Sequence, residues 1–287
     1  MTRLPHPLVS ATRLKQRLDA GEPSTLLDAR WVLGGESQRH AYDESHLPGA
    51  RWVEFDDALT GTPGDGGEGG RHPMPNRKSF QSAMRAAGVM NDVPVVVYDA
   101  SNSLAAARAW WLLRYFGKLD VQVLDGGFDA WVAAGGDVVP GEDTPAEEGD
   151  FVATPRQLTA VDAEGAADLA DRHLLIDARS PERFAGQNEP VDAVAGRIPG
   201  AVNIPALSNV GPDGRFLSTD DLAMRFTAKG LPTHQRVGVY CGSGVQAMHL
   251  ALALEVSGVF PDPAVYVGSW SDWITDPDRP VESDAWT

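Results

Sequence analysis

Short apolar runs that have the character of buried strands recur along the chain. They are rich in Val, Leu and Ile, and they cover residues 25–30, 93–98, 121–124, 174–179 and 237–240. Helical stretches lie between them. One begins after Ser10 and ends at Gly21, and an alanine-rich one runs through Trp110 and Trp111. This alternation predicts α/β domains, each with a mainly parallel sheet flanked by helices.

The second half of the chain repeats elements of the first. Four elements recur in the same order at nearly one spacing, which indicates a tandem duplication of one domain. The pairs are Leu-Asp-Ala-Arg at 27–30 and Ile-Asp-Ala-Arg at 176–179, Pro-Gly-Ala at 48–50 and 199–201, Tyr98-Asp99 and Tyr240-Cys241, and the segments 126–131 and 268–273.

An acidic segment rich in Pro and Gly separates the two copies. Residues 140–150 have no apolar period, as is typical of a linker. We therefore predict an N-terminal domain of residues 1–139, a linker of residues 140–155 and a C-terminal domain of residues 156–287.

Cys241 is the only cysteine in the chain, and it follows the apolar run 237–240. Gly242-Ser243-Gly244 and a helical stretch from Val245 come next. A strand–loop–helix turn points backbone N–H groups and a helix N-terminus at the sulfur, and both favour the reactive thiolate. The alternative is a small buried hydrophobic residue, but the glycines, which let the loop close around an anion, favour a nucleophile. Asp99 stands at the equivalent place, so we expect thiol chemistry only in the C-terminal domain.

Composition narrows the class of protein. The 287 residues are 43% hydrophobic, which suffices for two packed cores. One cysteine excludes an intrachain disulfide and a multi-cysteine zinc site and fits a reducing compartment, so we expect a cytoplasmic protein without metal or cofactor. No apolar run suits a secretory signal or approaches the ~18 residues of a membrane span. The net charge of −16 argues against nucleic acid as a partner.

Taken together, the motifs resemble those of the two-domain rhodaneses, the thiosulfate and 3-mercaptopyruvate sulfurtransferases. The resemblance covers nearly the whole chain, and the common order of the motifs makes it specific. It implies two rhodanese-like domains, of which the first, with Asp99 at the cysteine position, is non-catalytic. Besides the Asp-Ala-Arg element of each half, it rests on His46-Leu-Pro-Gly-Ala, Ala109-Trp-Trp, Asp125-Gly-Gly, Arg197-Ile-Pro-Gly-Ala-Val-Asn-Ile-Pro and Cys241-Gly-Ser-Gly-Val.

The resemblance implies a persulfide relay at Cys241. The thiolate takes the outer sulfur of a donor, and the remainder of the donor leaves as pyruvate or sulfite. An acceptor then removes the sulfur; thioredoxin, a small thiol or cyanide would serve. The N–H groups of the loop, at Gly242, Gly244, Val245 and Gln246, would stabilise the anionic sulfur.

The cysteine loop bears on the donor. In this family a basic loop goes with thiosulfate, a dianion, whereas the loop here is uncharged, and Ser243 can hydrogen-bond to the sulfur or the donor. The resemblance therefore favours 3-mercaptopyruvate, with thiosulfate as the alternative. Gln246 departs from the threonine that is usual in the mercaptopyruvate type.

Arg183 matches the arginine that binds the substrate in this family, and a guanidinium suits a carboxylate bidentately. The second arginine that often follows a Glu-Pro pair is missing, because Val191 stands there. Arg197 is a candidate replacement; its other interpretation is to fix the Pro-Gly-Ala turn.

His72 and Asp56 match positions proposed, in mercaptopyruvate enzymes, to form a relay with the serine of the cysteine loop. A histidine can move the proton between the mercaptopyruvate thiol and the leaving enolate. The alternative for His72 is an exposed loop histidine. We interpret the Asp-Arg pairs at 28 and 30 and at 177 and 179 as structural.

Two other classes of protein are alternatives. Cysteine-dependent phosphatases also use a strand–loop–helix turn, but their loop ends in an arginine that clamps the phosphate, and the residue here is Ala247. A non-catalytic rhodanese-like binding module is the other alternative. It describes the first half, but Cys241 argues against it for the second.

Overall fold

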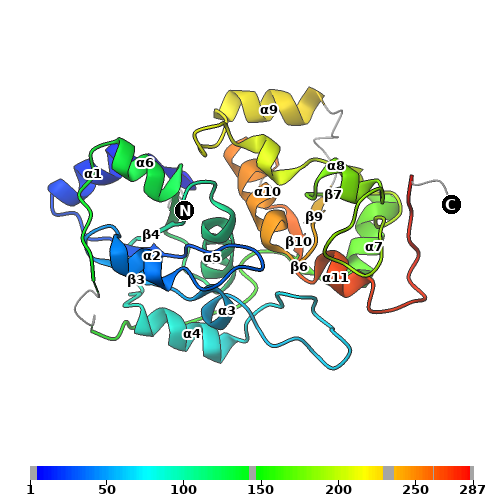
Figure 1. The fold of residues 1–287 in the computed structure, drawn as a ribbon, viewed down its shortest axis with the longest axis horizontal. Helices are drawn as coiled ribbons and strands as arrows, with labels where there is room; N and C mark the ends of the chain where they lie inside the picture. Colours follow the sequence, from blue (N-terminus) through cyan, green and yellow to red (C-terminus); the bar gives the residue numbers. More distant parts are fainter. Residues whose placement is uncertain (1–4, 142–146, 229–235, 261, 285–287) are drawn as a thin grey trace. The chain divides into compact units, whose positions relative to one another are not determined.

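The computed structural model describes residues 5–141, 147–228, 236–260 and 262–284, and the chain forms two compact units (Figure 1). The N-terminal unit contains residues 1–60, 75–157 and 210–216, and the C-terminal unit contains residues 61–74, 158–209 and 217–287. Each unit therefore includes a short segment from the other half of the sequence. The boundaries 1–139, 140–155 and 156–287 stay a prediction, and part of that linker, residues 142–146, lies outside the described residues.

The N-terminal unit is built on a five-stranded sheet in the order β1-β5-β4-β2-β3, with every neighbouring pair parallel. Its strands are β1 (Leu8–Val9), β2 (Thr25–Asp28), β3 (Ala50–Trp52), β4 (Val95–Tyr98) and β5 (Val121–Leu124). Its helices are α1 (Ala11–Asp19), α2 (Arg39–Glu44), α3 (Phe55–Ala58), α4 (Arg77–Ala86), α5 (Leu104–Tyr115) and α6 (Gly127–Ala133).

The C-terminal unit repeats this topology with a five-stranded parallel sheet in the order β6-β10-β9-β7-β8. Its strands are β6 (Ala160–Val161), β7 (Leu174–Asp177), β8 (Val202–Asn203), β9 (Val237–Tyr240) and β10 (Ala264–Tyr266). Its helices are α7 (Ala163–Arg172), α8 (Pro181–Phe184), the 3₁₀ helix η1 (Ala206–Asn209), α9 (Thr219–Ala228), α10 (Val245–Val256) and α11 (Ser269–Trp273). The predicted α/β class, duplication and parallel sheets are confirmed.

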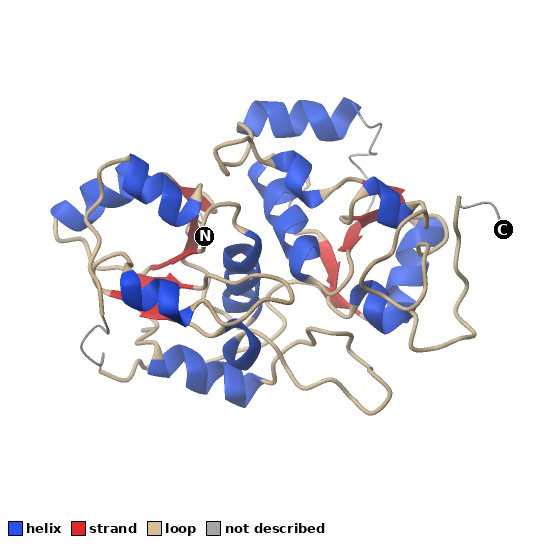
Figure 2. Ribbon diagram, in the orientation of Figure 1, coloured by secondary structure: helices blue, strands red, loops and turns tan. Residues whose placement is uncertain are grey.

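Helices cover both faces of each sheet (Figure 2). In the N-terminal unit, α1 and α6 pack on one face, where Leu14 and Trp131 join the strand residues in one core, and α5 lies on the other. In the C-terminal unit, α7 and α11 cover one face through Leu169 and Trp270, and α10 covers the other. Nearly all of α10 is buried, because a helix that is apolar all round has no face for water.

The predicted elements end where their sequences dictate. The Ser10 side chain caps α1 by accepting a hydrogen bond from the Arg13 N–H (3.2 Å). Strands β2 and β7 stop at Asp28 and Asp177, two residues before the predicted ends, because the following polar residues turn out of the sheet. No helix within the described residues is long and apolar enough to cross a membrane.

Candidate active site

Cys241 lies directly after β9 at the carboxyl edge of the sheet, and it is only 2% exposed. The Gly244 N–H donates a hydrogen bond to its Sγ (3.1 Å). Gly244 has φ +87°, a conformation that glycine adopts without strain, and it turns the chain into α10. The partial positive charge at the start of α10 therefore lies beside the sulfur loop, so the loop suits a negatively charged sulfur.

The first residues of α11, the helix that follows the neighbouring strand β10, clamp this loop. The Cys241 N–H donates to Ser269 Oγ (3.1 Å), and the Trp270 N–H donates to the Cys241 carbonyl (2.9 Å). The Ser271 N–H donates to the Gly242 carbonyl (2.9 Å). These bonds fix the backbone on both sides of the sulfur.

Asp99 occupies the equivalent frame in the N-terminal unit, where the Phe128 N–H donates to its carbonyl (2.9 Å). Its carboxylate accepts hydrogen bonds from the N–H groups of Ser103 (3.0 Å), Ala105 (3.0 Å) and Ala106 (3.2 Å). Burial raises the pKa of Asp99 to about 6, although those N–H groups oppose the shift. This loop thus holds an anion of its own and no thiol.

His72 contacts the cysteine loop. It lies in the segment 61–74, which belongs to the C-terminal unit, and its Nδ1 is 2.8 Å from Ser243 Oγ. Which of the two groups donates depends on the tautomer of the ring. Asp56 lies in α3 of the N-terminal unit, where burial and the nearby Glu54 raise the pKa of its carboxyl. Its part in a relay stays a prediction.

Two guanidinium groups converge on Gly242. A Cβ atom placed on this glycine would lie 2.9 Å from Arg71 Nη2 and 3.2 Å from Arg183 Nη2. The loop itself is uncharged, as expected, but two cations from other segments stand next to it. Sequence reasoning selected Arg183 and missed Arg71, whose one sequence signal is its place beside His72.

Two buried carboxylates hold these arginines. Glu189 accepts from Arg183 Nε (2.9 Å), and Asp192 accepts from Arg183 Nη2 (2.7 Å) and forms an ion pair with Arg71 Nη1. Burial would raise the pKa of Glu189, but the Arg183 hydrogen bond and two backbone N–H groups hold it below its usual value. Burial raises the pKa of Asp192 despite the two arginines. Neither carboxylate was among the site residues predicted from the sequence.

The other predicted residues have more ordinary surroundings. Val245 is the buried first residue of α10, and Gln246 follows it, half-buried. Arg197 pairs with Glu282 (2.5 Å) and Asp284 (2.7 Å), and its guanidinium lies 4.5 Å from the centre of the Phe184 ring. These contacts support its structural interpretation, in which it fixes the Pro-Gly-Ala turn.

The Asp-Arg pairs of the two halves are buried ion pairs, Asp28 with Arg30 (2.7 Å) and Asp177 with Arg179 (2.6 Å). Both arginines also donate to a backbone carbonyl of a following loop, at Ser45 in one unit and at Gly196 in the other. This arrangement agrees with the structural role expected for them.

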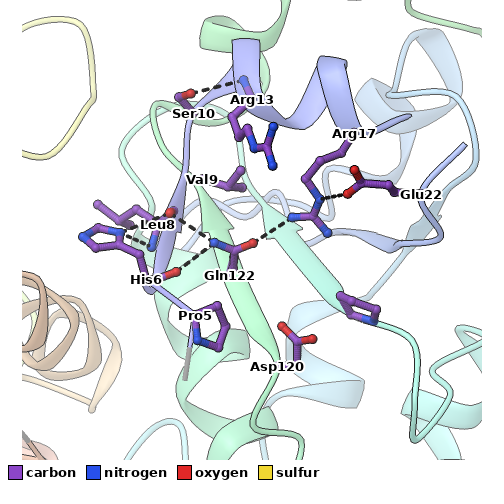
Figure 3. A pocket seen from close by; sticks show the side chains of 11 residues that line it. Pro5, His6, Leu8, Val9, Ser10, Arg13, Arg17, Glu22, Asp120 and Gln122 are labelled. Atoms are coloured by element: carbon purple, nitrogen blue, oxygen red, sulfur yellow. Dashed lines mark hydrogen bonds and ion pairs between the residues drawn. The ribbon is translucent and has the colours of Figure 1, made fainter. Parts of the chain in front are cut away.

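A pocket of about 530 Å³ lies in the N-terminal unit beside β1, β5 and α1 (Figure 3). Its polar groups bind one another, since Arg17 Nη1 donates to Gln122 Oε1 (2.8 Å) and Arg17 Nε pairs with Glu22 (3.5 Å). No cysteine lines it, and Cys241 remains the candidate nucleophile. The described residues include no cluster of three or more His, Cys, Asp or Glu side chains suited to a metal ion.

Comparison with known proteins identifies the family of this chain. Residues 10–134 and 161–276 match the model of the rhodanese-like domain. SseB of Mycobacterium tuberculosis, named provisionally as a thiosulfate sulfurtransferase, is 43% identical over 280 residues and 96% of each chain. A Pseudomonas aeruginosa protein, named provisionally as a 3-mercaptopyruvate sulfurtransferase, is 44% identical over 281 residues, 96% of this chain and 97% of its own.

A solved structure gives the same result. SseA of Escherichia coli, described as a 3-mercaptopyruvate sulfotransferase with the rhodanese fold, superposes with a TM-score of 0.80 at 32% identity. The match covers 93% of this chain and 100% of that one. Two matched domains and full-length relatives with one class of activity lead to a single conclusion: the chain belongs to the rhodanese-like family, as a two-domain sulfurtransferase.

Proposed function

We propose that this enzyme transfers the sulfur of 3-mercaptopyruvate, as the sulfane sulfur of a persulfide on Cys241, to a thiol or to cyanide. One observation carries the proposal: the only thiol of the chain lies in a clamped loop that directs the Gly244 N–H at its sulfur (3.1 Å). A buried sulfur with a backbone donor and a helix N-terminus beside it suits chemistry in which the sulfur is negatively charged.

The reaction proceeds in two displacements. The Cys241 thiolate attacks the donor sulfur, the carbon–sulfur bond breaks, and its electron pair leaves on the enolate of pyruvate. The thiol proton of the donor passes to that enolate, and Ser243 with His72, 2.8 Å apart, supplies a path for it. An acceptor thiolate then attacks the outer sulfur and releases the Cys241 thiolate. Thioredoxin or a small thiol in the cytoplasm would serve, as would cyanide.

Thiosulfate is a second candidate donor. The observation in its favour is that the guanidinium groups of Arg71 and Arg183 lie near Gly242, although Glu189 and Asp192 balance their charge. After thiosulfate gives up its outer sulfur, the remainder would leave as sulfite. Thiosulfate also brings no thiol proton to be moved. Steady-state kinetics with both donors, in parallel, decides between them, and we expect kcat/KM to be higher for 3-mercaptopyruvate.

Cys241→Ser tests the nucleophile. A hydroxyl is far less nucleophilic and cannot hold a persulfide, so transfer from both donors should vanish while the fold persists. Mass spectrometry of the wild type after exposure to donor, without acceptor, should find about 32 Da added to the Cys241 peptide, as a covalent intermediate requires. Sulfur transfer by the serine variant above a few per cent would overturn the assignment.

A further inference from the structure

The segment 61–74 fixes Arg71 against the turn that holds Cys241. The Arg71 N–H donates to Ser271 Oγ (3.0 Å), and the Gly69 N–H donates to Asp272 Oδ1 (2.7 Å). Gly70 has φ +76°, and a Cβ there would collide with the carbonyl oxygen of Gly268, so the close approach requires glycine. The backbone of Arg71 is thus tied to the N-terminus of α11.

The Arg71 guanidinium has one occupied edge and one open edge. Nη1 pairs with Asp192. Nε is buried and has no hydrogen-bond partner among the described residues, while Nη2 is the atom that faces Gly242, 2.9 Å from an ideal Cβ there. Nε and Nη2 share one edge, which is the fork that binds a carboxylate through two parallel hydrogen bonds. A buried N–H without an acceptor costs free energy, so this edge is incomplete without a ligand.

Arg183 approaches the same point with a different part of its guanidinium. Glu189 accepts from Nε and also pairs with Nη2 (2.9 Å), and Asp192 accepts from Nη2. Nη1 has no acceptor within the described part of the chain, and it lies 3.3 Å from the ideal Cβ position at Gly242. The two carboxylates therefore direct unsatisfied N–H groups of both arginines towards the cysteine loop.

Charge balance distinguishes between donors. The two arginines and the two carboxylates, all with side chains at most 30% exposed, sum to zero. A monoanion added to this neutral cluster leaves one excess negative charge, whereas a dianion leaves two. Because charges interact strongly when partly desolvated, the cluster suits a single carboxylate better than thiosulfate.

We propose that Arg71 binds the carboxylate of the sulfur donor through Nε and Nη2, with Arg183 Nη1 beside it, and so selects a 2-oxo carboxylate donor. This inference rests on the proposed function, since it assigns a donor-binding residue to the same site. It gives the C-terminal active site a cation from the first half of the sequence.

Alkylation of Cys241 tests Arg71 without sulfur transfer. Iodoacetate carries a carboxylate, and iodoacetamide is its neutral analogue of similar size, so the ratio of their rates reports anion binding beside the sulfur. We expect Arg71→Ala to lower this ratio about ten-fold or more, through loss of a charge-assisted pair of hydrogen bonds. Arg71→Lys keeps the charge but not the pair of parallel N–H groups, so its rate ratio should lie between those of the wild type and Arg71→Ala.

Arg172→Ala is the matched control. It removes an arginine of the C-terminal unit whose side chain is 72% exposed, and its ratio should equal that of the wild type. In steady state, Arg71→Ala should raise KM for 3-mercaptopyruvate about ten- to a hundred-fold and change kcat less.

The outcomes separate this inference from the proposed function. A folded Arg71→Ala variant with the wild-type alkylation ratio and KM overturns the role of Arg71. A lowered ratio in an enzyme that transfers no sulfur from either donor leaves the anion site standing and refutes the proposed function. If thermal unfolding shows that the alanine variant does not fold, the lysine variant decides, and a wild-type ratio there overturns the inference.

Discussion

The hydrogen bond between His72 and Ser243 allows a quantitative test of the proton path. If His72 only positions Ser243, its removal costs one hydrogen bond, about 0.5–1.5 kcal/mol or a two- to ten-fold change, for every donor. If His72 also moves the thiol proton of 3-mercaptopyruvate, its loss costs about 10²- to 10⁴-fold, for that donor alone. The two roles thus differ in both size and donor dependence.

Three substitutions separate these roles. An asparagine can place a polar atom near the position of Nδ1, 2.8 Å from Ser243 Oγ, but it cannot transfer a proton at neutral pH. His72→Asn should therefore retain most activity with thiosulfate and lose most of it with 3-mercaptopyruvate. His72→Ala should lose slightly more with both donors, and Ser243→Ala should resemble His72→Asn.

The assay is kcat/KM for each donor with one acceptor, in the three variants and the wild type. Thermal unfolding of each variant confirms that the fold is kept. The reasoning is refuted if His72→Asn retains full activity with 3-mercaptopyruvate, or if His72→Ala slows both donors by the same factor. In either case His72 serves only to hold the loop.

Two further predictions concern charged groups. Arg183→Ala should raise KM for 3-mercaptopyruvate about ten- to a hundred-fold, and it should lower stability by about 1–3 kcal/mol, because Glu189 and Asp192 each lose one partner but keep Arg179 and Arg71. An unchanged KM in steady-state assays would contradict its role. The pKa of the Asp99 carboxyl is about 6 in the folded protein, whereas its ordinary value, which applies to the unfolded chain, is 3.8. The free energy of unfolding of the wild type, relative to that of Asp99→Asn, should therefore fall by up to about 3 kcal/mol as pH rises from about 4 to about 6. Denaturant unfolding of both proteins measures this difference, and a difference that does not change with pH would contradict the prediction.

Local patterns predicted most of the fold. The apolar runs at 121–124 and 237–240 became β5 and β9 with the expected bounds, and the helix after Gly244 begins where the glycine loop ends. These elements depend on neighbours in the sequence, through burial, propensity and caps. The two-residue strands β1, β6 and β8 have no such signal, because their pairing partners, not their composition, make them strands.

The candidate site was predictable only where a motif carries it. Cys241 and Gly244 belong to one loop, and their contact follows from the strand–loop–helix geometry. The pairing of Arg71 with Asp192 joins residues far apart in the sequence, in two segments without an apolar period. The one local signal of Arg71 is its place beside His72, so the role proposed for it in donor binding rests on the fold.

The segment 61–74 also bears on how such a duplicated chain can change. It comes from the first copy of the domain, but it belongs to the C-terminal unit and carries Arg71 and His72. A gene truncated to the second copy would keep Cys241 and its clamp and would lose both side chains. Given the roles proposed for Arg71 and His72, the first copy, which has Asp99 instead of a nucleophile, is not expendable. The first copy can be retained without an activity of its own, because the second copy alone lacks Arg71 and His72.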